Sequence, residues 1–398
     1  MKVLTNNNSR LTVLFTLIFV LLFYFNNETL PNNLSQRVSQ PCMFVAIGEL
    51  AFFIISGGLK YLTRGRSLVV ASVLIFLTIF SGLFDSIFSN GYSLLIMNIL
   101  VAVTFVSILP YNVFVKYFVH VTVFFAIASL LITYLLSPVV RILPLSHLTN
   151  SAGVSFTNAY LCYLVDYDGY IRNTGIFREA GVWGGFLSLA LILLISSRDL
   201  FSKKIFNIFS IILVLTILST FSTTCFLTLL LIYIVSLLQS NNGLRNNKFL
   251  FFVLLLGVAA FFYYRGSIEE IDNTFNKLSR ESSSYQTRTE IIVNSISIMF
   301  NNPFGLGIVN GAAALMQSNT LDAFHNTSTL VAGGVYFGFL YLIIYIIGMF
   351  LFCKKRLGTW MFIIPLFLLL SGEQYIFNPW WYMFLFYGFT PADKRISL

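Results

Sequence analysis

Long apolar runs constrain the fold of this 398-residue chain more than any other feature. A helix needs about 20 apolar residues to cross the hydrocarbon core of a bilayer, and many of the runs approach that length. Only 10% of the residues are charged, whereas about 25% is usual in a soluble globular protein. The runs are continuous rather than alternating, which favours helices over a membrane β-barrel. The sequence therefore predicts an all-α, polytopic integral membrane protein.

We expect about twelve transmembrane helices in a single transmembrane domain that covers residues 1–398. The predicted spans are residues 11–25, 42–62, 68–88, 92–109, 114–136, 180–196, 205–219, 221–238, 249–264, 329–352, 360–371 and 380–389. The last two are short and contain Pro365 and Pro379, so a re-entrant hairpin is an alternative there. The first run resembles a signal peptide, but no small-residue cleavage site follows it, and we expect it to remain as a helix.

Basic residues concentrate on the cytoplasmic side of membrane proteins, and they indicate the orientation here. With twelve spans and the N-terminus inside, 16 of the 24 lysines and arginines are cytoplasmic and the other 8 are outside. The cytoplasmic set is Lys2, Arg10, Lys60, Arg64, Arg66, Lys116, Arg198, Lys203, Lys204, Arg245, Lys248, Lys354, Lys355, Arg356, Lys394 and Arg395. The opposite orientation reverses the bias, so both termini are predicted to be cytoplasmic.

Two long segments then fall on the outer face, residues 138–179 and 265–326, while every inner loop is too short for a domain. Nucleotides are absent outside the membrane, so a reaction there must use a substrate that carries its own activation. The first segment is predicted to be loop-like. The second is predicted to contain an amphipathic helix around residues 268–278, a helix over residues 287–300 and a turn after Pro303.

The first candidate site is the stretch 172–185, where Arg172, Arg178 and Glu179 precede a strongly apolar run. Guanidinium groups suit the binding of phosphate, and charge at the edge of a membrane helix is often functional. The alternative is that both arginines anchor the helix at the interface, while Glu179 favours the positive end of its helix. Ser222 lies in the hydroxyl-rich turn 219–224 and could bind a sugar or a phosphate, or only complete a helix–helix turn.

The second candidate group lies in the second outer segment. His325 is a natural proton acceptor near neutral pH, and Asn326 follows it. Alternatively, Asn326 or Thr327 caps the helix that begins near Thr329, and His325 has no catalytic role. Arg288 sits in a mixed polar run, where a solvated salt-bridge face is the default expectation.

Other classes of function find less support in the sequence. The basic residues lie in short loops between apolar runs, as topology requires, so no nucleic-acid partner is expected. The four cysteines have no metal-ligand spacing, and no metal site is predicted. The glycines of residues 305–311 follow a helix rather than a strand, which argues against a nucleotide-binding loop. Glu49, Asp85, Asn98 and His120 lie within spans but are scattered, so a proton-coupled transporter is unsupported.

The order of these features resembles that of O-antigen polymerases (Wzy-type), in the O-antigen polymerase/ligase superfamily. Residues 172–179, R-N-T-G-I-F-R-E, are similar to the family signature R-x-x-G-x-F-x-E. Five further features follow in the family's order: the turn 219–224, Arg288, the run N-P-F-G-L-G at 302–307, His325 with Asn326, and three glycines at 333, 334 and 338. Ala180 is a departure, since the family often has proline after the glutamate.

The resemblance implies a GT-C-like membrane glycosyltransferase that moves a glycan from undecaprenyl diphosphate, without a metal or other cofactor. Arg172, Arg178 and Arg288 would neutralise the diphosphate, and His325 or else Glu179 would accept the proton of the attacking hydroxyl. Ser222 and Asn326 would complete the substrate-binding set.

The implied partners are the lipid-linked oligosaccharide, membrane lipids, a chain-length regulator and a flippase, in the inner membrane of a bacterium. The F-R-E ending and the modest second outer segment favour a polymerase over a ligase that transfers to lipid A–core. A flippase without chemistry is the remaining alternative, although no internal repeat is visible.

Overall fold

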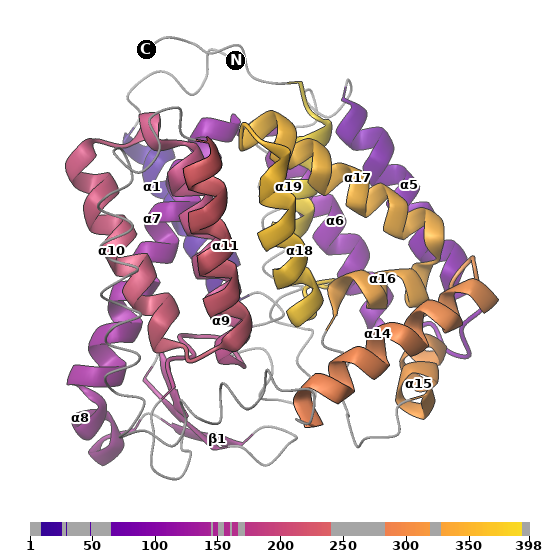
Figure 1. The fold of residues 1–398 in the computed structure, drawn as a ribbon, viewed down its shortest axis with the longest axis horizontal. Helices are drawn as coiled ribbons and strands as arrows, with labels where there is room; N and C mark the ends of the chain where they lie inside the picture. The colour runs from indigo at the N-terminus through magenta and orange to yellow at the C-terminus, as the bar shows by residue number, and fades with distance from the viewer. Residues whose placement is uncertain are drawn as a thin grey trace.

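The structure is a computed structural model, and it describes residues 9–25, 29, 48, 65–144, 146–149, 155–159, 161–165, 172–239, 283–318 and 328–391. The described part is mainly helical (Figure 1). The predicted spans 42–62 and 249–264, the predicted helix around 268–278, and both His325 and Asn326 lie outside the described residues.

The helices and strands of the described part follow one another along the chain. The α-helices are α1 (Ser9–Tyr24), α5 (Arg66–Gly82), α6 (Asn90–Ile108), α7 (Tyr111–Leu130), α8 (Ser137–Ile142), α9 (Ala180–Ser196), α10 (Lys203–Ser219), α11 (Thr223–Gln239), α14 (Ser283–Asn301), α15 (Ile308–Ser318), α16 (Thr329–Phe337), α17 (Phe339–Arg356), α18 (Ile363–Gly372) and α19 (Pro379–Phe389). A π-helical turn, η1 (Leu131–Leu135), extends α7, and 3-10 turns η2 (Arg198–Leu200) and η3 (Trp360–Phe362) precede α10 and α18. The strands are β1 (Ser146–Thr149), β2 (Ser155–Asn158) and β3 (Tyr163–Val165).

Most predicted spans within the described residues correspond to one helix each, with ends shifted by a few residues. Among the described residues, two helices, Asn90–Ile108 and Tyr111–Leu135, are long and apolar enough to cross a bilayer. Several other apolar helices are shorter, among them Ala180–Ser196 and Thr223–Gln239. The fold is consistent with a helical membrane protein, and the number of twelve spans stays a prediction.

The predicted span 329–352 is wrong as a single helix. The structure breaks it at Gly338, which has φ +86° and ψ 176°, and α16 and α17 lie on either side of the break. The predicted span 68–88 is also too long, because α5 ends at Gly82 and the chain turns through Asp85 before α6.

The first predicted outer segment is not merely loop-like. It contains an antiparallel sheet of order β1-β2-β3, in which Ser146 pairs with Asn158 and Phe156 pairs with Val165. Phe156, Leu164 and Val165 are buried, so the short strands cover apolar surface. The all-α prediction therefore missed this sheet, since strands of three or four residues give too few alternations to read from sequence.

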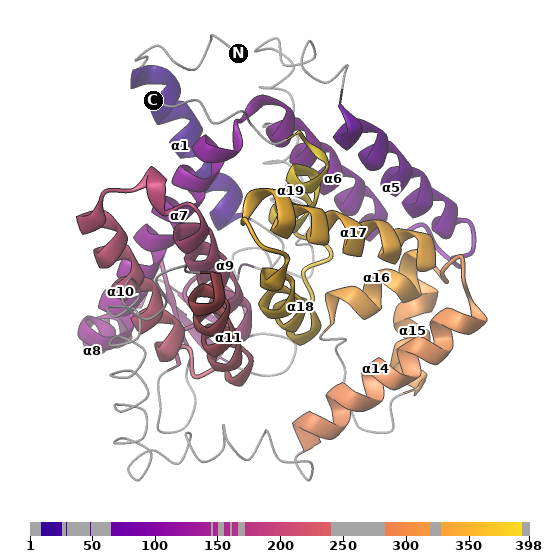
Figure 2. The same cartoon turned by 45° about the horizontal axis from the view of Figure 1, so that its top comes forward.

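The helices form two groups with α18 and α19 between them, as two views agree (Figures 1 and 2). On one side lie α1, α7 and α9–α11, and on the other lie α5, α6 and α14–α17. α19 lies in the core, because residues 380–386 are all fully buried. The ring of Trp380 lies 5.4 Å from Phe19 and 5.2 Å from Phe118, so large aromatic side chains join the N-terminal and C-terminal helices.

The described parts of the two predicted outer segments lie at the same end of the bundle. The sheet and α8 come from the first segment, α14 and α15 come from the second, and all lie at the bottom of Figure 1. The α9–α10 connection and the C-terminal end of α17 lie at the opposite end. That opposite end carries Arg198, Lys203, Lys204, Lys354, Lys355 and Arg356.

Candidate active site

The stretch 172–179 connects β3 to α9, and Asn173 fixes it to two helices. Asn173 is fully buried and donates from Nδ2 to Ser129 Oγ of α7 at 3.1 Å and to Ser219 Oγ of α10 at 3.0 Å. Its Oδ1 accepts from the N–H of Gly175, which adopts φ +56°. Local packing therefore accounts for the first part of the R-x-x-G-x-F pattern, and sequence reasoning had given Asn173 no role.

Phe177 anchors the end of this stretch against α9. Its ring stacks on Trp183 at 5.3 Å and on Phe186 at 4.7 Å, and all three side chains are fully buried. The aromatic cluster fixes where Arg178 and Glu179 emerge, directly before the first turn of α9.

Arg172 holds the turn that connects α10 to α11. Its Nε donates to the carbonyl oxygen of Thr220 at 3.3 Å, and its Nη2 donates to that of Phe221 at 3.2 Å. Phe221 has φ +48°, a region that bulky residues rarely adopt. The structure thus gives Arg172 a turn-stabilising role that the sequence did not predict. A guanidinium has five N–H donors, so this role is compatible with an anion on another edge.

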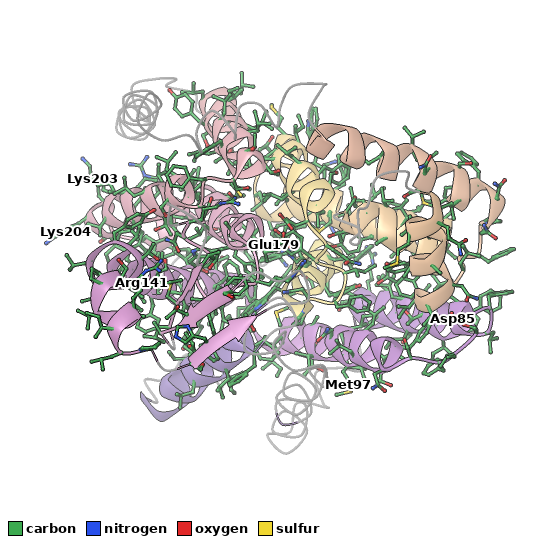
Figure 3. All side chains as sticks on the ribbon, turned by 90° about the horizontal axis from the view of Figure 1, so that it is seen from below. Asp85, Met97, Arg141, Glu179, Lys203 and Lys204 are labelled. Carbon is green, nitrogen blue, oxygen red and sulfur yellow. The ribbon has the colours of Figure 1, made fainter. Side chains whose placement is uncertain are left out.

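Arg178 and Glu179 pair with each other at the start of α9. Arg178 Nη1 lies 3.0 Å from Glu179 Oε1, and the two side chains are 24% and 49% exposed. Exposed ion pairs contribute roughly 0–1 kcal/mol, so an incoming anion can compete for Arg178. Seen from the end that holds the sheet, Glu179 lies near the middle of the molecule (Figure 3).

Ser222 joins this group from the α10–α11 turn. It is 7% exposed, and its Oγ would lie 3.6 Å from a Cβ at Gly181, the second residue of α9. The structure therefore brings together the predicted residues Arg172, Arg178, Glu179 and Ser222 around the start of α9.

Glu373 lies beside this group, and nothing in the sequence had singled it out. It follows α18, is only 7% exposed, and its carboxylate occupies the space where Gly181 lacks a side chain. The only sign in the sequence was one acidic residue directly after an apolar run, in a chain with 15 acidic residues.

The backbone of Glu373 is bonded to the start of α16. Its carbonyl oxygen accepts from Thr329 Oγ1 at 2.7 Å and from Thr329 N–H at 3.2 Å. Ser328 is the N-cap of α16, because its Oγ accepts from Val331 N–H at 3.4 Å. The expectation that Asn326 or Thr327 caps this helix is therefore wrong, and the capping explanation for Asn326 falls away.

The loop 302–307, which we call the glycine loop, fills the break between α16 and α17. The N–H groups of Leu306 and Gly307 donate to the carbonyls of Val335 and Tyr336 at 2.9 and 3.0 Å, and Phe339 N–H donates to Pro303 at 3.0 Å. A helix break leaves carbonyls without partners, and the loop supplies these partners. The sequence predicted only a simple turn after Pro303 and did not predict these hydrogen bonds to the break between α16 and α17.

The glycine loop leads into α15, which the sequence did not predict. Asp85 accepts from Val309 N–H at 2.8 Å, Asn310 N–H at 2.9 Å and Tyr92 Oη at 2.6 Å, while Ile308 N–H donates to Tyr92 Oη. Partial burial raises the pKa of the Asp85 carboxyl, but these hydrogen bonds outweigh it and lower the pKa below its usual value. Asp85 caps α15 from the turn after α5, a structural role rather than a place on an ion path.

The remaining predicted site residues come from the second outer segment. Arg288 lies on the N-terminal half of α14, and its side chain is outside the described part of the chain. α14 packs on α16, where Met299 fills the space beside Gly334. His325 and Asn326 lie outside the described residues and precede Ser328 by three and two positions. Among the described residues no group of three His, Cys, Asp or Glu side chains could hold a metal ion.

The apolar helices are consistent with a helical membrane protein, and Arg178, Glu179, Ser222 and Glu373 lie together around the start of α9. Residues 208–333, about a third of the chain, match the family model described as O-Antigen ligase (Wzy_C). Members of this family are glycosyltransferase-like enzymes that act on lipid-linked sugars. The family covers both polymerases and ligases, so the match does not distinguish them. No curated protein and no solved structure matches the chain.

Proposed function

We propose that this protein polymerises undecaprenyl-diphosphate-linked oligosaccharide repeat units into O-antigen, on the periplasmic face of the bacterial inner membrane. In this proposal, residues 138–179 and 265–326 are periplasmic, and both termini are cytoplasmic. The distribution of basic residues supports this orientation, because the end of the bundle opposite the candidate site carries a dense group of lysines and arginines.

The observation that carries the proposal is the connection between the starts of α9 and α16. The start of α9 carries Arg178 and Glu179, the start of α16 directly follows the stretch with His325 and Asn326, and Glu373 contacts both starts. His325 and Asn326 precede Ser328 by only three and two positions in the sequence, and the proposal therefore assigns them to the same site. Two parts of the sequence more than a hundred residues apart would thereby form one site.

The proposed reaction needs no external energy source. A hydroxyl oxygen of the acceptor sugar attacks the anomeric carbon of the donor glycan, the bond from that carbon to the phosphate oxygen breaks, and undecaprenyl diphosphate leaves with both electrons. His325, or else Glu179, accepts the proton of the hydroxyl. Arg172, Arg178 and Arg288 stabilise the charge that grows on the diphosphate, and the transfer is metal-independent. Ser222 and Asn326 bind the substrate.

A ligase is the second candidate function, because the family that matches residues 208–333 includes ligases. It differs only in the acceptor, which would be lipid A–core instead of a lipid-linked repeat unit. The F-R-E ending of residues 177–179 supports the polymerase. A flippase would perform no chemistry, and a chain-length regulator and a flippase are proposed as partners instead.

Purified protein in lipid nanodiscs tests this function directly. Incubated with undecaprenyl-diphosphate-linked repeat units alone, it should yield a ladder of longer lipid-linked glycans and release undecaprenyl diphosphate. Extension that occurs only when lipid A–core is added would assign the protein to the ligases. No transfer to either acceptor would refute both enzymatic assignments.

A further inference from the structure

The side chain of Glu373 is acidic and buried, and the transfer reaction proposed above gives it no role. It lies at the junction of the α18 end with α9 and α16, and only 7% of its surface is exposed. Ionisable side chains buried in a membrane bundle are costly, and they mark ligand sites more often than most residues do.

The surroundings of the carboxylate are polar and closely fitted. Gly181 leaves the space that the carboxylate occupies, because a Cβ there would overlap Glu373 Oε1. Ser222 Oγ borders the same space. The first turn of α9 carries the positive end of the helix dipole, which favours a carboxylate at this place. Thr329 holds the Glu373 backbone through its hydroxyl and its N–H group, so the residue cannot shift without disturbing α16.

The charge of Glu373 indicates which part of a substrate it suits. A carboxylate repels a diphosphate, and the arginines at 172 and 178 on the neighbouring stretch already offer the positive charge that a diphosphate needs. Carboxylate oxygens accept several hydrogen bonds each, and the hydroxyl groups of a saccharide can donate them. A neutral saccharide presents many such donors and no negative charge that would oppose the carboxylate.

We propose that the Glu373 carboxylate binds a hydroxyl group of the incoming acceptor saccharide, beside Gly181 and Ser222. The subsite rests on the proposed function for its place in the reaction. It separates the site into an arginine part for the diphosphate and a carboxylate part for the sugar. Binding, not proton transfer, is the role assigned to Glu373.

Two variants and one control address the subsite. Glu373→Gln keeps the shape but removes the charge. Gly181→Ala keeps the charge but displaces the carboxylate. Gly333→Ala is the matched control, since a Cβ at this buried helical glycine meets its nearest atom, Ile376 Cδ1, at an ordinary 3.4 Å.

The test measures binding of two probes to full-length protein in nanodiscs by saturation-transfer NMR. One probe is the saccharide released by mild acid from the host's own lipid-linked repeat unit, and the other is inorganic pyrophosphate. A hydrogen bond to a charged group predicts a loss of about 10- to 100-fold in saccharide affinity for Glu373→Gln and for Gly181→Ala. Pyrophosphate affinity should stay within about twofold of the wild type or increase, and Gly333→Ala should bind both probes normally.

Three results would overturn the subsite. Saccharide affinity within about twofold of the wild type in Glu373→Gln would show that the carboxylate does not contact the sugar. An equal loss for both probes would show a structural role, as would failure of both Glu373→Gln and Gly181→Ala to fold while Gly333→Ala folds. A wild-type protein that extends no lipid-linked glycan would refute the proposed function instead, whatever the saccharide measurement shows.

Discussion

Gly305 and Gly338 pack backbone against backbone where α16 ends and α17 begins. A Cβ at Gly305 would lie 2.5 Å from the Tyr336 carbonyl oxygen, and a Cβ at Gly338 would lie 2.5 Å from that of Pro303. This contact joins the segment that carries Arg288 on α14 to the helix that follows His325. The contact therefore fixes the glycine loop, which follows α14, against the break between α16 and α17.

Substitution of either glycine should uncouple the two segments. Gly338→Ala and Gly305→Ala place a side chain at positive φ, which costs on the order of 1–3 kcal/mol, and also force it into a backbone carbonyl. We expect loss of long glycan chains together with a clear fall in the unfolding temperature. Gly358→Ala is the control, because φ there is +79° but its only close neighbour is the end of the Gln239 side chain at 3.1 Å. Equal behaviour of Gly338→Ala and Gly358→Ala would contradict the importance of the contact.

Asp85 should stabilise the glycine loop and α15 in a pH-dependent way. Asp85→Asn removes the charged acceptor of two backbone N–H groups, and we expect it to cost about 1–3 kcal/mol of unfolding free energy. The pKa of Asp85 is lowered from 3.8, so its contribution is complete above that value and is lost as the pH falls below it.

Thermal unfolding in detergent at several pH values measures both effects. The difference between wild type and Asp85→Asn should be constant near neutrality and should shrink in acid. Tyr387→Phe, which removes a hydrogen bond to the carbonyl oxygen of Leu109, is a neutral comparison that should show little pH dependence of this kind. A difference that grows as the pH falls would be inconsistent with a lowered pKa.

Substitutions of the arginines should distinguish a residue that positions the α10–α11 turn from a residue that contributes only its charge. Arg172→Ala removes two hydrogen bonds to the α10–α11 turn as well as the charge, so we expect it to lower both stability and chain extension. Arg172→Lys keeps the charge but not the planar fork, and should recover only part of each. Arg288→Ala should abolish long chains while the protein inserts into the membrane in normal amounts.

Glycan ladders and the amount of membrane-inserted protein, measured in the same cells, decide between these outcomes. Unchanged ladders in both Arg172→Ala and Arg288→Ala would contradict the proposal that these arginines bind the diphosphate.

His325 should be essential for the chemical step. Without its imidazole, proton removal from the acceptor hydroxyl slows by about 10²- to 10⁴-fold, so His325→Ala should eliminate extension without a change in stability. The initial rate with purified protein measures this loss. Full activity in His325→Ala would transfer the role to Glu179, and Glu179→Gln would then be the inactive variant.

The sequence predicted most of the apolar helices in the described part because each of these is a long apolar run between polar loops, as at 180–196, where α9 has the predicted bounds. It failed at Gly338 because an apolar run does not show where a second segment replaces its hydrogen bonds. It missed α15 because that helix is capped by Asp85, more than two hundred positions away.

The residues of the candidate site were also predicted only in part. Arg178, Glu179 and Ser222 were visible as polar residues at the edge of apolar runs, and the structure brings them together. Glu373 was not visible, because its importance depends on Gly181 of a distant helix. The hydrogen bonds from Arg172 to the carbonyl oxygens of Thr220 and Phe221 could not be predicted either, because no local sequence pattern shows which carbonyl groups a guanidinium contacts.

Deletion of the gene, followed by gel electrophoresis of lipopolysaccharide, tests the central claim most directly. A polymerase predicts that the ladder collapses to a single repeat unit on lipid A–core, and that the intact gene restores the ladder. Bare core with accumulated lipid-linked polymer would identify a ligase, and bare core without outer-face intermediates would identify a flippase. Either of these two results would contradict the account.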